Sequence, residues 1–410
     1  MKNIVFTLVI SLLLGNNLIS QSKVKLGIDV LRENFEFLKG KRVGLITNAT
    51  GVDSKLNSTI DIIFNLPEVK LVALFGPEHG VRGDIPAGEK IESYIDQKTG
   101  IPVYSLYGKT RKPTKEMLKN VDVLIYDIQD IGVRSYTYIS TMGLAMEAAA
   151  ENNIQFVVLD RPNPLTGEKF EGSIVRKDFI SFIGQFPIPY IYGLTCGELA
   201  KMINEEGWLA NNQKCNLKII KMDGWKRSMR WEDTGLQWIP TSPHIPHYYS
   251  AQFYASTGIL GELGVISEGV GYTLPFQLLG AEWIDENEIA SKMNKLNLPG
   301  VRFRPVVWRP FYGRFQGQIL RGVQIHIDDF QKCNLTSIQF LFLQELKKLY
   351  PDKNVFEIAS PDRIRSFDLA TGWDEIRKSF SQDFKYESIK KIWESEANDF
   401  KKKASKYFLY

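Results

Sequence analysis

Hydrophobic residues in the first half of the chain fall in short, nearly continuous runs that are separated by polar loops. Four of these runs span residues 43–47, 71–75, 121–126 and 155–159. Runs of this length are typical of parallel strands buried on both faces of a sheet. The Ala-, Met- and Leu-rich segment 141–151 suits a crossover helix between the last two strands. The pattern therefore predicts an α/β fold with a Rossmann-like parallel sheet.

The pattern changes beyond about residue 165. Residues 195–199 have the Thr-x-x-Glu sequence of a capped helix start, residues 317–328 alternate like a half-buried strand, and residues 336–349 form an amphipathic helix. A chain of 410 residues also exceeds what one hydrophobic core usually fills. We therefore expect a Rossmann-like domain over residues 22–280 and a smaller α+β domain over residues 281–410.

The N-terminus is typical of an export signal. A short positive start that contains Lys2 is followed by an apolar run over residues 4–14, which Gly15 and two asparagines interrupt. The run is too short for a stable membrane span but suits the core of a signal peptide. We predict a signal peptide over residues 1–21, an exported protein that is periplasmic or secreted, and no stable insertion in a membrane.

Composition and motifs exclude several classes of function. The 51 Lys and Arg nearly balance the 47 Asp and Glu, and no basic stripe is present, so a nucleic-acid partner is not expected. The three cysteines allow no disulfide framework and no zinc spacing. His244 and His247 have no acidic residue near them in sequence that would favour a metal site. Phosphate- and dinucleotide-binding fingerprints are absent, so we expect no metal and no cofactor.

Polar side chains follow each of the four predicted strands. The carboxyl ends of parallel strands line one edge of a sheet, where ligands bind. We therefore expect these loops to converge on one polar pocket and to bind substrate there. The candidate binding residues are Asn48, His79, Arg82, Asp130, Arg134, Tyr136, Asp160 and Asn163.

Carboxylates are the richest catalytic resource of the chain. Glu78 lies between Pro77 and His79 in a glycine-bracketed turn directly after a strand. Glycoside hydrolysis uses two carboxyl groups, one that protonates the leaving oxygen and one that acts as base or nucleophile. We expect Glu78 to be the general acid or base, with Asp127 or Glu268 as the second carboxyl. The structural alternative is that some of these carboxylates cap helices or pair with nearby arginines.

Aromatic residues are concentrated in a segment of poor periodicity over residues 225–253. Sugar rings have apolar faces that stack on aromatic side chains, so the cluster is compatible with a carbohydrate site. An ordinary core would use the same residues. The cluster consists of Trp225, Trp231, Trp238, Tyr248, Tyr249 and Phe253.

Four separate loop motifs, in order along the chain, resemble those of one known family. The motifs are Phe75-Gly-Pro-Glu-His-Gly80 with Arg82, Asp127-Ile-Gln-Asp130 with Arg134, Leu159-Asp-Arg-Pro-Asn-Pro164, and Ser267-Glu-Gly269. The chain thereby resembles the exo-β-N-acetylmuramidases, glycoside hydrolase family 171, over essentially its whole mature length.

The resemblance implies a Rossmann-like domain, a smaller C-terminal domain and an active-site cleft between them. It also implies an exo-acting glycosidase of cell-wall turnover that releases terminal N-acetylmuramic acid from the non-reducing end of peptidoglycan fragments. The alternative is a non-catalytic periplasmic binding protein that holds an amino sugar or muropeptide in the same cleft. A carboxyl with a strongly raised pKa would favour the enzyme.

Overall fold

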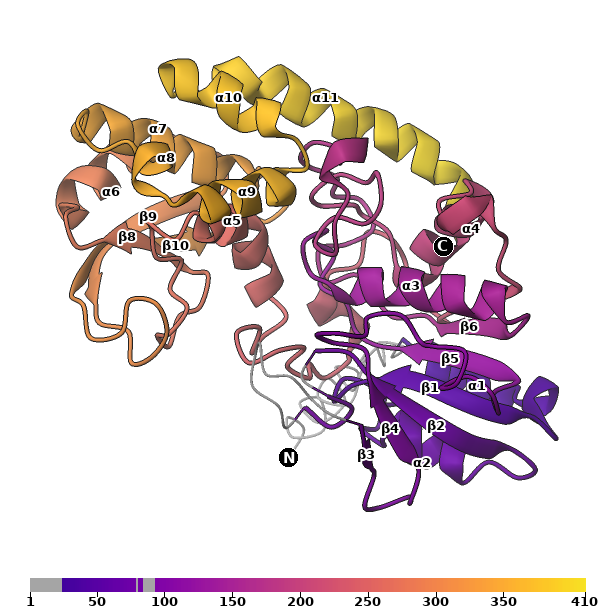
Figure 1. The fold of residues 1–410 in the computed structure, drawn as a ribbon. Helices are drawn as coiled ribbons and strands as arrows, with labels where there is room; N and C mark the ends of the chain where they lie inside the picture. The colour runs from indigo at the N-terminus through magenta and orange to yellow at the C-terminus, as the bar shows by residue number, and fades with distance from the viewer. Residues whose placement is uncertain (1–23, 79, 84–92) are drawn as a thin grey trace, which may run out of the picture.

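The computed structural model describes residues 24–78, 80–83 and 93–410, so the predicted signal peptide lies outside the described residues. The first unit is built on a mostly parallel sheet (Figure 1). All four predicted strands are present in it, as β1 (Arg42–Thr47), β2 (Lys70–Gly76), β5 (Val123–Asp127) and β6 (Gln155–Leu159). The expected α/β class is confirmed.

Three further strands complete a seven-stranded sheet of order β3-β4-β2-β1-β5-β6-β7. They are β3 (Tyr94–Ile95), β4 (Pro102–Ser105) and β7 (Leu217–Ile220). Only β3 runs antiparallel to its neighbour. Because all the other strands run the same way, their carboxyl ends lie along one edge of the sheet.

Helices cover both faces of this sheet, which explains why its strands are apolar on both sides. One face packs against α1 (Gly27–Glu33) and α2 (Thr59–Phe64), and the other against α3 (Tyr138–Glu151) and α4 (Cys196–Glu205). The predicted cap of α4 is present, since the Thr195 hydroxyl accepts a hydrogen bond from the Glu198 backbone N–H.

The second unit has an antiparallel sheet of order β8-β10-β9, with β8 at Leu278–Ala281, β9 at Val301–Trp308 and β10 at Leu320–Ile327. Its helices are α5 (Ser250–Glu262), α6 (Glu286–Lys295), α7 (Ser337–Leu349), α8 (Val355–Ile358), α9 (Pro361–Thr371), α10 (Asp374–Asp383) and α11 (Glu387–Ala404). The predicted strand and helix near 317–349 correspond to β10 and α7.

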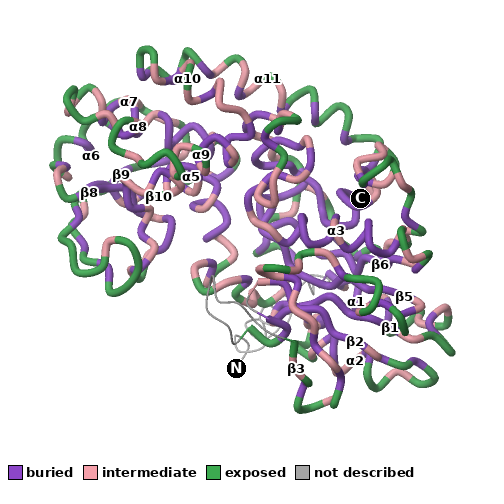
Figure 2. Tube along the Cα trace, in the orientation of Figure 1, coloured by how far each residue is buried: buried purple, intermediate pink, exposed green. Residues whose placement is uncertain are grey.

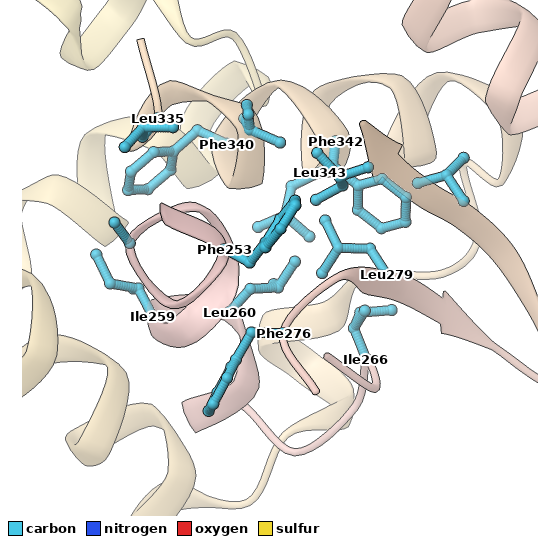
Figure 3. Packing of buried hydrophobic residues seen from close by; sticks show 14 of the residues in the cluster. Phe253, Ile259, Leu260, Ile266, Phe276, Leu279, Leu335, Phe340, Phe342 and Leu343 are labelled. Atoms are coloured by element: carbon cyan, nitrogen blue, oxygen red, sulfur yellow. The ribbon is translucent and has the colours of Figure 1, made fainter. Parts of the chain in front are cut away.

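The boundary expected near residue 280 falls inside β8. Phe253 and Leu260 of α5 pack with Leu279 of β8 and with Phe340 and Leu343 of α7 in one core (Figure 3). Because α5 contributes to that core, it packs as part of the second unit.

The last long helix holds the two units together. The buried residues of α11 recur every three or four positions, so they form a single stripe. Ile389 and Trp393 belong to the core of the second unit, whereas Phe400 and Ala404 belong to the core beside α3 and α4. The outer face of α11 is exposed (Figure 2). Within the described part of the chain, no helix is both long and apolar enough to cross a membrane.

Candidate active site

A cavity of about 180 Å³ lies where the two units meet. Its first wall comes from loops at the carboxyl edge of the parallel sheet, and its second from α5 and the segments that flank it. Hydroxyl groups and aromatic rings form most of the lining. The lining residues are Glu78, Ser135, Tyr136, Thr137, Tyr138, Ser242, His244, Ile245, Tyr254 and Phe276.

A tight turn after β2 carries Glu78 to this cavity. The Gly80 backbone N–H donates to the Pro77 carbonyl at 3.0 Å, and Gly80 has a φ of 73°. A Cβ at Gly76 would lie 3.2 Å from the Gly80 Cα, so the chain reverses with little room for side chains. Glycine is favoured at both positions for these reasons. The turn leaves Glu78 partly exposed at the wall of the cavity.

Two tyrosines lie close to the Glu78 carboxylate. Burial, together with a hydrogen bond to Glu78, raises the pKa of Tyr107 to about 12. Burial also raises the pKa of Tyr138, whose hydroxyl donates to the Thr241 carbonyl at 2.5 Å. Both phenols therefore stay protonated at neutral pH and serve as hydrogen-bond donors. Asn48 is also hydrogen-bonded to Tyr138.

Hydroxyl groups of the sheet-edge loop contact hydroxyl groups of the second wall. The Tyr136 hydroxyl donates to the Thr241 hydroxyl at 2.8 Å, and the Tyr254 hydroxyl lies 3.1 Å from that of Ser135. Phe276 adds an aromatic ring and has a backbone φ of 64°, a strained conformation that is concentrated at functional sites. A carboxyl group that is surrounded by hydroxyls and ring faces is suited to a carbohydrate, which has both hydroxyls and apolar ring faces.

Comparison with known proteins assigns this architecture to a family. The profile "Exo-beta-N-acetylmuramidase NamZ, N-terminal" matches residues 43–249, and the corresponding C-terminal profile matches residues 252–410. The chain belongs to the NamZ family. The resemblance inferred from the loop motifs is thereby confirmed. The N-terminal profile ends directly before α5, and the C-terminal profile begins in the first turn of that helix.

Members of the NamZ family match the chain over nearly its full length. The peptidoglycan β-N-acetylmuramidase NamZ of Bacillus subtilis (strain 168) is 46% identical over 396 residues, which cover 96% of this chain and 93% of that protein. Two crystal structures of DUF1343 family proteins from Bacteroides fragilis NCTC 9343 are also similar. One is 58% identical with a TM-score of 0.91, and the other is 29% identical with a TM-score of 0.76. Each alignment covers 95% of this chain and 99% of the other.

Among the residues predicted for the site of this NamZ family member, Glu78 and Tyr136 line the cavity. Asn48 lies behind the lining, where it is hydrogen-bonded to Tyr138. His79 lies outside the described residues. The other candidate residues have different positions and partners.

Asp127 is part of a buried ion pair and is not among the residues that line the cavity. Its two carboxylate oxygens lie 2.6 and 2.9 Å from Nε and Nη2 of Arg161, and the Thr59 hydroxyl donates to Oδ2 at 2.5 Å. Asp127 and Arg161 have almost no exposed side-chain surface. The alternative of pairing with a nearby arginine therefore describes Asp127, whose carboxylate is occupied by Arg161 and Thr59.

Asp130, Asp160 and Asn163 are buried beneath the loops rather than exposed to the cavity. The Tyr192 hydroxyl and the Gly132 backbone N–H both donate to Asp130, whose pKa is raised by burial to about 7. Asp160 accepts hydrogen bonds from loop and C-terminal groups, and burial raises its pKa to about 6. Asn163 closes a turn by accepting from the Leu165 backbone N–H. The described contacts of these three side chains stabilise the loops.

The two predicted arginines also have structural partners. Arg82 forms an ion pair with Asp96 at 2.8 Å, and the hydrogen bond from Arg82 lowers the pKa of Asp96 to about 2. Arg134 is fully buried and donates to the carbonyls of Ser173, Ile188 and Ala370. Because Ala370 belongs to α9, Arg134 connects the sheet domain to the second unit.

Glu268 lies in a second charged cluster, at the C-terminal end of α5. It is close to Glu262, Arg314 and Arg363, and burial raises its pKa. Its side chain fits there because the neighbouring residue is Gly261, where a Cβ would lie 2.9 Å from the Glu268 carboxyl carbon. Glu268 is not among the residues that line the cavity of Glu78.

Histidines near the cavity interact with aromatic rings. His244 Nε2 lies 2.8 Å from the Tyr312 hydroxyl, and the His247 ring stacks on that of Tyr249. Among the described side chains, no group of three or more His, Cys, Asp or Glu is arranged to hold a metal ion.

Sequence analysis missed most of the cavity wall. Tyr138 is the first residue of α3, two positions after Tyr136, so the aromatic residues that follow the third predicted strand were an available signal. Tyr254 and Phe276 had no such signal, because the packing of the second unit brings them to the sheet edge. Half of the predicted aromatic cluster lies in the core, since Trp225, Trp231 and Phe253 are buried.

Proposed function

We propose that this NamZ family member is an exo-acting glycosidase that releases N-acetylmuramic acid from the non-reducing end of peptidoglycan fragments. The observation that carries the proposal is the Glu78 carboxyl group in a hydroxyl-lined cavity between the two units. The 46% identity to a peptidoglycan β-N-acetylmuramidase over 96% of the chain supports the substrate class. Such a reaction belongs to cell-wall turnover.

In this proposal Glu78 transfers the proton that the reaction requires. Its carboxylic acid donates a proton to the glycosidic oxygen as the bond from that oxygen to the anomeric carbon breaks. Tyr107 donates a hydrogen bond to Glu78 and positions it. The hydroxyls of Tyr136 and Tyr254 lie within the lining and suit the hydroxyls of the sugar.

The substrate itself is the proposed source of the nucleophile. Of the described carboxylates, only Glu78 belongs to the lining of the cavity, while Asp127 is paired with Arg161. In this route the acetamido oxygen of N-acetylmuramic acid bonds to the anomeric carbon as the leaving oxygen departs with the proton from Glu78. Water then adds to the anomeric carbon, the acetamido group is restored, and a proton returns to Glu78.

An exported location is proposed from the N-terminal sequence. The apolar run over residues 4–14 and its flanks have the composition of a signal peptide, and peptidoglycan lies outside the cytoplasmic membrane. Fractionation of the producing cells, followed by N-terminal sequencing of the protein, tests this. A mature N-terminus near residue 22 is expected, whereas an intact Met1 in the cytoplasmic fraction would contradict export.

A chromogenic N-acetyl-β-muramide tests the activity directly. The protein should release the chromophore from this glycoside, and from the corresponding N-acetylglucosaminide far more slowly. Tight binding of N-acetylmuramic acid without hydrolysis of any muramide would instead identify a sugar-binding protein. A Glu116→Gln variant serves as the control for Glu78→Gln, because Glu116 is a surface carboxylate that is 85% exposed.

A further inference from the structure

Large exposed hydrophobic side chains are concentrated in one hairpin of the second unit. Among the described residues, four of the nine lie between residues 307 and 319, where β9 turns into β10. Phe311 is 59% exposed and Tyr312 48% exposed. Exposure of adjacent aromatic rings in solvent is unfavourable unless a ligand or partner covers them.

A second loop holds this hairpin in place. The Phe311 backbone N–H donates to the Gly271 carbonyl at 2.7 Å, and the Phe311 ring lies 5.3 Å from that of Tyr272. Gly271 has a φ of 93°, and a Cβ there would lie 2.2 Å from the Tyr312 carbonyl oxygen. Only glycine permits so close an approach of the two backbones. The exposed rings are therefore held on a defined backbone.

The same two loops lead directly to the cavity of Glu78. The Tyr312 hydroxyl is hydrogen-bonded to His244, and the two rings stack with their centroids 5.9 Å apart. His244 and Phe276 line the cavity, and Phe276 lies on the loop that contains Tyr272. In Figure 1 this part of the second unit extends below its sheet, toward the level of the N-terminal end of α5. The exposed rings are thus continuous with the rim of the site.

We propose that Tyr272, Phe311 and Tyr312 form an aromatic platform that binds the sugar on the leaving-group side of the cleaved bond. This inference rests on the proposed glycosidase function. An exo-acting enzyme encloses the terminal sugar, so the rest of the glycan leaves across the rim of the cavity. An N-acetylglucosamine ring has apolar faces that stack on exposed aromatic rings, and its hydroxyls stay hydrated there.

The platform is tested by replacing Phe311, which is exposed and distant from Glu78 in the chain, with alanine. Two substrates are compared: the disaccharide of N-acetylmuramic acid linked to N-acetylglucosamine, and methyl N-acetyl-β-muramide, whose methyl group is too small to reach the platform. Chromatography of released N-acetylmuramic acid measures both reactions. We expect Phe311→Ala to lower kcat/KM for the disaccharide about fivefold to tenfold, the effect of one aromatic stacking contact, and to leave the methyl glycoside unchanged.

Phe64→Ala is the matched control, because Phe64 is a 44% exposed phenylalanine on α2 of the first unit. It should leave both substrates unaffected. An equal loss on both substrates with Phe311→Ala, or a loss on neither, would overturn the platform. A change in oligomeric state with unchanged kinetics would assign these rings to contact with a second copy and would also overturn it.

A binding measurement separates the platform from the proposed function. Calorimetric titration with the disaccharide and with N-acetylmuramic acid requires no turnover. Phe311→Ala should weaken binding of the disaccharide alone. If the wild-type protein hydrolyses neither substrate, but Phe311→Ala still weakens binding of the disaccharide alone, the proposed function fails and the platform stands. Equal affinity of the wild type and the variant for the disaccharide would reject the platform.

Discussion

Glu78 and Asp127 occupy equivalent places in the sheet and have different surroundings. Glu78 follows β2, and Asp127 is the last residue of β5. These two strands flank β1 on either side. The turn after β2 carries Glu78 to a cavity lined by hydroxyls, whereas Asp127 remains at the strand end and is bound by Arg161. A carboxylate at the carboxyl edge of a sheet is therefore available for chemistry only if no cation reaches it.

The difference also separates groups that act on substrate from groups that stabilise the fold. A buried carboxylate paired with an arginine is costly to remove, since its partner is left as an uncompensated charge. A carboxylate at a cavity wall is seldom optimised for stability. Substitutions in the two regions should therefore affect different measurements.

The largest expected effect is on turnover, with Glu78→Gln. The amide can neither donate nor accept the proton, so kcat on a chromogenic N-acetyl-β-muramide should fall by about a hundredfold to ten-thousandfold. The thermal unfolding midpoint should be nearly unchanged. A Glu78→Gln protein with near-normal turnover would remove Glu78 from the reaction.

The second-largest expected effect is a loss of stability in the Asp127→Asn variant. Loss of the carboxylate leaves Arg161 unpaired in the interior, which should lower the free energy of unfolding by about 3–5 kcal/mol in urea titration. Replacing Arg161 with methionine as well should recover part of this loss. Asp127→Asn with wild-type stability and no turnover would instead place Asp127 in the reaction.

A smaller effect is expected in the pH dependence of stability. Burial raises the pKa of Asp130 from 3.8 to about 7 and that of Asp160 to about 6. The folded protein therefore keeps these protons at pH values where the unfolded chain has lost them, so stability falls as pH rises from about 4 through about 7. Thermal unfolding midpoints should decrease from pH 5 to pH 8, and Asp130→Asn should reduce this decrease.

Asp96 does not contribute to that decrease in stability. The hydrogen bond from Arg82 lowers the pKa of Asp96 to about 2, so its contribution to stability is lost only below about pH 4. A decrease that is identical in wild type and Asp130→Asn would show that Asp130 does not titrate in this range.

The smallest effect is expected from Tyr107→Phe. The substitution removes one hydrogen bond to Glu78, worth roughly 1 kcal/mol, so kcat/KM should fall about fivefold. Tyr104→Phe is the control, because Tyr104 lies three residues away on β4 and packs against the ring of Phe75. Equal losses from both changes would argue against a specific role for Tyr107.

The strands and the sheet-edge loops were predictable because local sequence patterns indicate them. Near-continuous apolar runs require burial on both faces, and the Thr195 and Glu198 cap is a local signal. For Asp127, pairing with an arginine remained an open alternative in the sequence. The roles of Asp160 and Arg134 were not predictable, since they depend on partners far along the chain, such as Tyr410 and Ala370.

The amino-acid sequence alone was sufficient to predict the α/β class, the strands whose loops meet at one edge, the turn that carries Glu78 and the family resemblance. Each of these depends on neighbours in the chain or on short motifs. Which polar groups face the cavity depends instead on the packing of distant segments. Arg161 reaches Asp127 across the sheet edge, while the packing of α5 and its following loop brings Tyr254 and Phe276 to Glu78. Contacts between distant segments determine whether a charge is neutralised, and no local pattern encodes them.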